Sequence, residues 1–154
     1  MATAAKARMI HPVETDSNFD VDRALGVLML RATLGLNILL HGVTRTITGS
    51  LAAFVNNTAT QFQNTPLPQW QVRAFATAIP FCEIVIGVLL LLGLATRWTL
   101  LAGSLLMLAL VFGTALRADW TLLELQMFYV LLYFILFMCR RYDVFSVKTL
   151  LRRD

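Results

Sequence analysis

Charged side chains are scarce in this sequence. Only 14% of its 154 residues are Asp, Glu, Lys or Arg, whereas 58% are hydrophobic. Because a soluble domain carries about a quarter charged residues, this composition excludes an ordinary soluble globular protein. The few basic residues lack the clustered face and stacking aromatics that nucleic-acid binding needs. We therefore expect an integral membrane protein that contacts lipid and has no nucleic-acid partner.

Cysteine and histidine are also rare. The two cysteines, Cys82 and Cys139, lie far apart without a CxxC or CxxCH pattern, so nothing indicates a disulfide framework, a zinc site or an attached c-type haem. We interpret both as small buried hydrophobic residues. The two histidines are His11, in a polar N-terminal stretch, and His41. This distribution predicts neither a bis-histidine haem nor a metal site.

The sequence does contain apolar runs long enough to cross a bilayer, which takes about 20 residues of helix. Four spans are predicted, over residues 24–48, 72–95, 98–116 and 121–139. They indicate an all-α, four-helix membrane bundle. The predicted organisation is a polar N-terminal arm (1–23), a four-helix membrane domain (24–139) and a basic C-terminal tail (140–154).

Basic residues predict the orientation of the bundle. Four spans place both termini on one side. Of the 13 Lys and Arg residues, Arg31 lies inside the first span, and Arg45, Arg73 and Arg117 lie on the far side. The remaining nine lie on the side of the termini. The positive-inside rule therefore predicts both termini in the cytoplasm.

The connection between the first two spans, residues 49–70, is rich in Thr, Asn and Gln. Leu51, Phe54, Val55 and Phe62 recur near helical spacing, which predicts a short amphipathic helix at the membrane interface. Such a helix is either a lid over a pocket or an anchored loop. Of these two alternatives we favour the anchored loop.

The first predicted span carries polar groups, although an ionisable side chain at its centre costs roughly 2.5–3.5 kcal/mol. Two glycines on the same helical face would let a neighbouring helix approach closely. The polar and small residues that share this face are Arg31, Gly35, Ile38, Gly42 and Arg45. Asn37 and His41 lie on the adjacent strip. We expect this face to point into the bundle.

Depths follow from a rise of about 1.5 Å per residue. They predict one polar layer between the mid-plane and the outer face, with Arg31 below it and within reach of Glu83. The layer consists of Asn37, His41, Glu83, Gln126 and Tyr129. In one interpretation Arg31 and Glu83 form a buried ion pair that only holds two helices together. In the other, the layer lines a pocket for a small polar headgroup.

Two motifs resemble those of the DoxX/DoxD family of small four-helix membrane proteins. The first comprises Leu30-Arg31, Gly35 and His41-Gly42, and the second comprises Glu83, Gly87, Leu89 to Leu92, Gly93 and Thr96-Arg97. Arg45 stands where the family often has Lys, which keeps the charge. Named members are subunits of thiosulfate:quinone oxidoreductase. The resemblance implies a bacterial inner-membrane subunit that passes electrons from a small reductant such as thiosulfate to quinone.

Three functions are weighed on these grounds. In a quinone-linked redox subunit, His41, Glu83 and Arg31 are the catalytic candidates, and Asn37, Gln126 and Tyr129 the candidates for binding quinone. His41 is the strongest of them because imidazole titrates near neutral pH. Electrons would come from a partner protein or a diffusible reductant. The alternative is a non-catalytic structural or assembly subunit of a larger membrane complex. A solute transporter is less favoured, since four helices without an internal repeat suit alternating access poorly.

Overall fold

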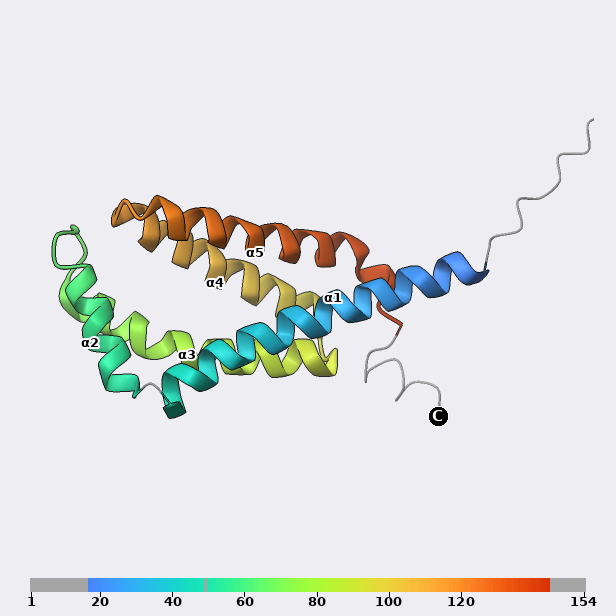
Figure 1. The fold of residues 1–154 in the computed structure, drawn as a ribbon, viewed down its shortest axis with the longest axis horizontal. Coiled ribbons are helices and arrows are strands. Elements are labelled where there is room, and N and C mark those ends of the chain that lie inside the picture. The colour runs from blue at the N-terminus through green and yellow to red at the C-terminus, as the bar shows by residue number, and fades with distance from the viewer. Residues whose placement is uncertain (1–16, 49, 145–154) are drawn as a thin grey trace, which may run out of the picture.

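A computed structural model describes residues 17–48 and 50–144, and this part of the chain is built from helices (Figure 1). They are α1 (Ser17–Val43), the π-helical turn η1 (Thr44–Thr48), α2 (Leu51–Gln61), α3 (Gln69–Leu92), α4 (Thr96–Leu116), α5 (Trp120–Cys139) and the 3-10 turn η2 (Arg140–Tyr142). Four stretches of the described residues are long and apolar enough to span a membrane: Asp20–Ile47, Gln69–Leu92, Thr96–Leu116 and Trp120–Tyr142. The predicted four-span, all-α architecture is confirmed, and α2 is the predicted short helix.

The helix boundaries have local causes. α1 begins at Ser17 rather than near residue 24, with Asp20 in its first turn, where a negative charge offsets the positive end of the helix dipole. Residues 1–16 of the predicted arm lie outside the described residues. α3 follows Pro68 and stops at Gly93, whose φ of 65° ends the helix in a left-handed conformation. Asp119 caps α5 by accepting the backbone N–H of Leu122 at 3.2 Å.

Glycines bring α1 and α3 into close antiparallel contact. A Cβ added to Gly35 would lie 2.9 Å from the Cβ of Leu90, and one added to Gly42 would lie 2.5 Å from the carbonyl oxygen of Pro80. On the opposing helix, a Cβ on Gly87 would lie 2.6 Å from the backbone nitrogen of Leu39. The predicted small-residue face of the first span therefore does point into the bundle.

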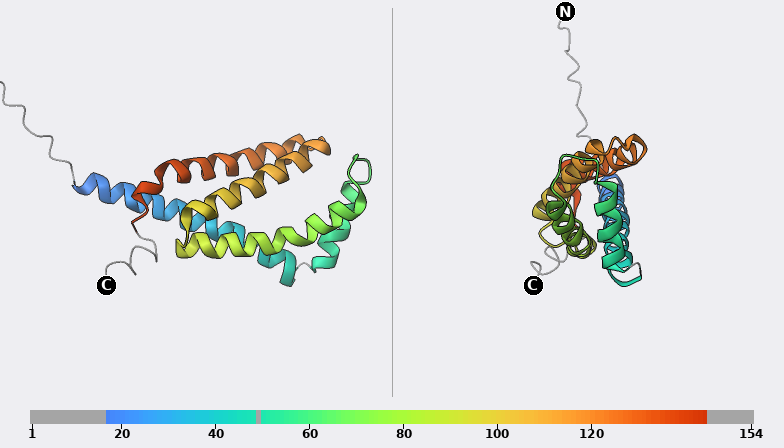
Figure 2. Two further views of the ribbon diagram at one scale, coloured as in Figure 1. Left: turned by 180° about the vertical axis from the view of Figure 1, so that it is seen from behind. Right: turned by 90° about the vertical axis from the view of Figure 1, so that its left-hand side faces the viewer.

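The remaining two spans, α4 and α5, form a second pair that diverges from α3 toward one end of the molecule (Figures 1 and 2). α2 lies across that open end. Arg73 of α3 fixes α2 from one side by donating to the Asn56 side chain at 2.8 Å. The main apolar core lies away from α2 and comprises Val27, Leu34, Ile38, Ile86, Leu90, Leu100, Met107, Tyr133 and Leu136. The divergence leaves room for a cavity on the α2 side of that core.

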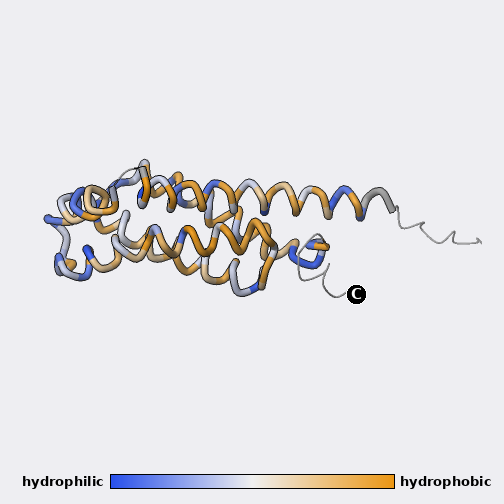
Figure 3. Tube along the Cα trace, turned by 90° about the horizontal axis from the view of Figure 1, so that it is seen from below, coloured by the Kyte–Doolittle hydropathy of each residue, from blue (hydrophilic) through white to orange (hydrophobic). Residues whose placement is uncertain are grey.

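The spans are largely hydrophobic along their length, and hydrophilic stretches gather near their ends (Figure 3). Leu105 and Phe128, for example, are exposed by 64% and 65%. Large exposed apolar side chains are expected where the surrounding solvent is lipid. Cys82 is among the exposed residues and Cys139 is half-buried, so the interpretation of Cys82 as buried is wrong. Cys82 precedes the buried Glu83 and points off the packed face of α3.

Candidate functional site

Arg31 lies in a buried polar cluster at the terminal end of the bundle. Its side chain is 2% exposed, and its Nε lies 3.3 Å from Oδ1 of Asp143. One Nη of Arg31 donates to the Leu90 carbonyl at 2.9 Å. The other carboxylate oxygen of Asp143 accepts the Thr96 hydroxyl at 2.9 Å. The cluster therefore ties α1 and α3 to the start of α4 and to the chain beyond η2.

The predicted ion pair between Arg31 and Glu83 is wrong. Gly35 packs against Leu90 and Gly42 against Pro80, so Arg31 is level with the end of α3. Glu83 lies seven residues before Leu90, which is about 10 Å along the helix axis. The glycine contacts determine which residues of α1 and α3 lie side by side. Depths counted from the predicted ends of the spans do not determine this. The polar residues therefore do not form the predicted single layer, because Arg31 pairs with Asp143 and Glu83 pairs with Arg45.

Glu83 is buried at 4% exposure and pairs with Arg45 of η1. The Arg45 guanidinium also lies over the Phe54 ring of α2, 4.8 Å from its centroid. The second carboxylate oxygen of Glu83 is buried and makes no hydrogen bond within the described residues. Arg45 thus connects a buried carboxylate on α3 with the aromatic side of α2.

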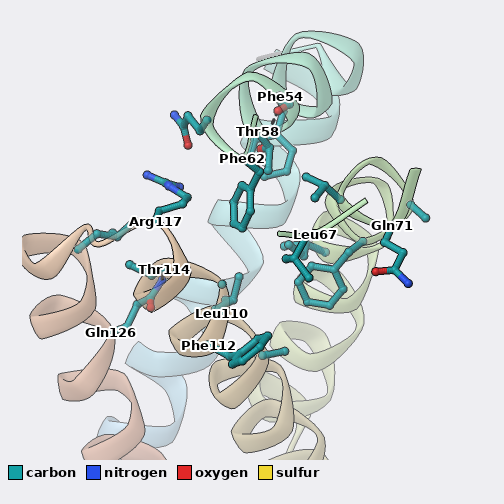
Figure 4. A pocket seen from close by; sticks show the side chains of 18 of the residues that line it. Phe54, Thr58, Phe62, Leu67, Gln71, Leu110, Phe112, Thr114, Arg117 and Gln126 are labelled. Atoms are coloured by element: carbon teal, nitrogen blue, oxygen red, sulfur yellow. Dashed lines mark hydrogen bonds between the residues drawn. The ribbon is translucent and has the colours of Figure 1, made fainter. Parts of the chain in front are cut away.

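A cavity of about 740 Å³ lies between α2, α3, α4 and the first turns of α5 (Figure 4). Phe62, just after α2, and Leu67 project between α3 and α4. The aromatic lining residues are Phe54, Phe62, Trp70, Phe75 and Phe112, and the polar ones are Arg45, Thr58, Gln61, Gln71, Thr114, Arg117 and Gln126. Of the two alternatives for residues 49–70, this geometry matches the lid, because α2 covers a pocket.

The wall of the cavity formed by α4 and α5 carries a buried polar pair, Thr114 and Gln126. Gln126 donates from Nε2 to the Thr114 hydroxyl at 2.9 Å, and Thr114 is buried. The Gln126 Oε1 is also buried but has no hydrogen-bond partner among the described residues. Nearby, Arg117 pairs with Asp119 at 2.9 Å and lies 5.4 Å from the centroid of Phe62. The cavity thus offers a spare acceptor and two cations among aromatic rings.

The other sequence-predicted residues lie outside this lining. Tyr129 donates its hydroxyl to Oδ1 of Asn37 at 3.0 Å, which joins α5 to α1. His41 is exposed on α1, and Glu83 pairs with Arg45 instead. Of the six residues predicted as catalytic or quinone-binding, Gln126 lines the cavity. Glu83 does not line it but pairs with Arg45, which does. The functional roles assigned to all six stay predictions.

Sequence reasoning missed several residues of these sites. From the sequence, Arg45 is placed on the inward face of the first span and Arg117 among the basic residues on the far side, and neither is assigned to a binding site. The sequence signal was the connection itself, which carries Phe54 and Phe62 near helical spacing. In the structure these two rings contact Arg45 and Arg117. Asp143 was missed because it follows the basic pair Arg140-Arg141 in the predicted tail.

Comparison with protein-family models matches residues 23–121 to MauE, the methylamine utilisation protein. No curated protein and no solved structure matches the chain. The matched segment covers most of α1, all of η1, α2, α3 and α4, and the start of α5, so it includes most of the cavity lining. The match supports a multi-span membrane family, but not DoxX/DoxD specifically. With four apolar spans in the described residues, the chain belongs to the MauE family of integral membrane proteins.

Proposed function

We propose that this protein is a membrane subunit of a redox system and that its cavity holds the headgroup of a membrane quinone. The MauE family is linked to a redox system by its role in methylamine utilisation. The observation that carries the proposal is the buried Oε1 of Gln126, which has no hydrogen-bond partner in the described part of the chain and lies in a cavity lined by aromatic rings. A buried polar group without a partner is costly unless something else satisfies it.

The size and shape of the cavity fit this ligand. Its volume of about 740 Å³ falls within the range of pockets that hold small organic molecules. Phe75 of α3 and Phe112 of α4 line it and are exposed by 42% and 59%. We infer from these exposed rings an opening of the cavity between the two helices, toward the hydrocarbon. A headgroup can lie inside while an isoprenoid tail stays in the bilayer.

The polar groups fit the two oxygens of a quinone. Arg45 and Arg117 supply N–H donors to carbonyl oxygens, and Oε1 of Gln126 accepts from the hydroxyl of the reduced form. Bound quinone would be the electron acceptor, and its reduction to the quinol takes two electrons and two protons. The protein contributes binding, orientation and a dry wall. The electron donor is a partner or a small reductant, and thiosulfate, implied by the DoxX resemblance, stays a prediction.

Trp70 provides a direct test, because it lines the cavity whereas Trp98 and Trp120 do not. In a Trp98→Phe/Trp120→Phe protein in detergent, decylubiquinone should quench Trp70 fluorescence saturably. Ala109→Phe, which fills the cavity, should abolish saturation. Ala102→Phe, two turns away on the exposed side of α4, is the matched control and should not. Equal, linear quenching of all variants would show only partition into the micelle and would refute the proposal.

A structural or assembly subunit remains the second candidate. The buried pair of Arg31 and Asp143 favours it, since this pair holds helices together and lies at the end away from α2. This candidate predicts a stoichiometric protein partner and no bound quinone. Mass spectrometry of the complex purified in mild detergent separates the two functions by detecting retained quinone.

A further inference from the structure

α1 carries a row of polar side chains on an exposed face. Thr33, Asn37 and His41 are spaced four residues apart, so they lie one above another on the helix surface. All three are exposed. None of them lines the cavity. We call this row the α1 polar ridge.

The ridge lies at the depth of the hydrocarbon. Tyr129 is close to the middle of the span Trp120–Tyr142, and its hydroxyl bonds to Asn37. Thr33 and His41 each lie about 6 Å from Asn37 along the helix axis. All three therefore fall inside an apolar layer about 30 Å thick.

The ridge also has hydrogen-bonding groups to spare. The structure gives no side-chain hydrogen bond to Thr33 or His41 among the described residues, and the bond from Tyr129 uses only the carbonyl oxygen of Asn37. Polar groups that face lipid are costly, and in membrane proteins such side chains bond across helix interfaces. Because the ridge is exposed in a single chain, we expect another helix to pack over it in the membrane.

We propose that the α1 polar ridge is the contact surface of a homodimer, covered by α1 of a second copy of this chain. Two copies inserted in the same orientation are related by a two-fold axis along the membrane normal. That axis places each ridge residue opposite its own counterpart at the same depth. An amide, a hydroxyl and a neutral imidazole each carry both a donor and an acceptor, so each can pair with a copy of itself.

The surroundings of the ridge suit this occupant. Leu36 and Leu40 flank it, exposed by 49% and 51%, and supply apolar contact. Toward the terminal end, Gly26 has nothing within 4 Å of an added Cβ, and a groove of about 400 Å³ runs there between α1 and α5. A second helix can therefore approach α1 closely beyond the ridge.

Disulfide cross-linking tests the contact. The background is Cys82→Ala/Cys139→Ala, because Cys82 is exposed and Cys139 is half-buried. Thr33→Cys is compared with Leu105→Cys, which is exposed by 64% near the middle of α4. Purified protein is reconstituted in liposomes at high lipid-to-protein ratio and oxidised. We expect the dimer yield at Thr33→Cys to exceed that at Leu105→Cys about tenfold, reflecting specific association. Equal yields would overturn the proposal.

Single-molecule photobleaching in the same liposomes tests the hydrogen bonds. Asn37→Leu should weaken dimerisation about tenfold, in the range of interhelical polar contacts. Tyr129→Phe is the matched control, since it removes the bond to Asn37 within one chain but leaves the ridge intact; its dimer fraction should equal that of the wild type. A monomeric wild type contradicts the proposal. So does cross-linking of Thr33→Cys in native membranes mainly to a different protein. Quinone quenching of Trp70 does not depend on this contact, so the two proposals fail separately.

Discussion

Arg31 of α1 and Asp143, just beyond η2, form an ion pair whose side chains are 2% and 6% exposed. The pair closes the bundle at the end where α1 begins and α5 stops. Arg23 supports the same closure, donating to the Tyr142 hydroxyl at 2.9 Å. The chain after the fourth span is therefore part of the fold up to Val144, and residues 145–154 lie outside the described part.

Asp143→Ala should destabilise the protein strongly. The substitution removes the carboxylate from a buried guanidinium, which costs about 3–5 kcal/mol when one partner of a buried pair is lost. Thermal unfolding in detergent should show a clear fall in Tm. The double variant Arg31→Met/Asp143→Leu should recover much of the loss, because it leaves no buried charge. A Tm of Asp143→Ala equal to that of the wild type would show that the pair is not formed.

Gly42→Ala should also destabilise, by about 1–3 kcal/mol, since the added methyl meets the backbone of α3 and forces the helices apart. Gly26→Ala is the matched control on the same helix, where a Cβ meets nothing within 4 Å. Alanine there should be neutral or stabilising by up to about 1 kcal/mol, because it favours helix over glycine. Similar melting temperatures for the two variants would argue against the close contact of α1 and α3.

Arg45→Met should harm stability more than the double variant Arg45→Met/Glu83→Gln. The single change leaves the Glu83 carboxylate buried without its cation, at a cost of about 3–5 kcal/mol, whereas the double change removes both charges. Chemical unfolding in mixed micelles measures the difference. If the double variant were the less stable of the two, Arg45 would not be the group that compensates the buried charge of Glu83.

Gln126→Leu should separate function from stability. The buried Oε1 of Gln126 has no hydrogen-bond partner among the described residues, so leucine removes an unsatisfied acceptor, but it also removes the hydrogen bond from Nε2 to the Thr114 hydroxyl. Because the two effects oppose each other, Tm should change little. Quinone affinity, read from Trp70 quenching, should fall about tenfold with the loss of about one hydrogen bond. A variant that melts lower yet binds quinone normally would assign Gln126 a structural role instead.

The spans and the packing of the first two could be predicted because both depend on local pattern. Apolar length locates the four helices, and Gly35 and Gly42 at helical spacing identify the close-packed face of α1. The start of α1 at Ser17 could not be predicted, because the stretch before residue 24 is polar and lacks membrane periodicity. Its first turn, with Asp20, falls in the stretch predicted to be a polar N-terminal arm.

The candidate site was less predictable because it depends on how whole helices are inclined. The cavity exists because α4 and α5 diverge from α3, and no single segment encodes that angle (Figure 2). Which side chains meet across the bundle depends on how the helices are aligned along their axes. For this reason the sequence suggests Glu83 as the partner of Arg31, whereas the structure has Asp143. Gln126 lines the cavity, and its role in binding quinone stays a prediction, whereas Asn37 and Tyr129, which the sequence groups with it, bond to each other outside the cavity lining.

The lid helix α2 lies at the opposite end of the bundle from the end of α5 and the beginning of α1 (Figure 1). With both termini in the cytoplasm, as the basic residues predict, the end of the bundle that holds the cavity would lie on the periplasmic side of the membrane. If the cavity binds quinone as proposed, an enzyme that delivers electrons to it would then have to be exported across the membrane before it could dock. The cytoplasmic surface would be left to anchoring and assembly.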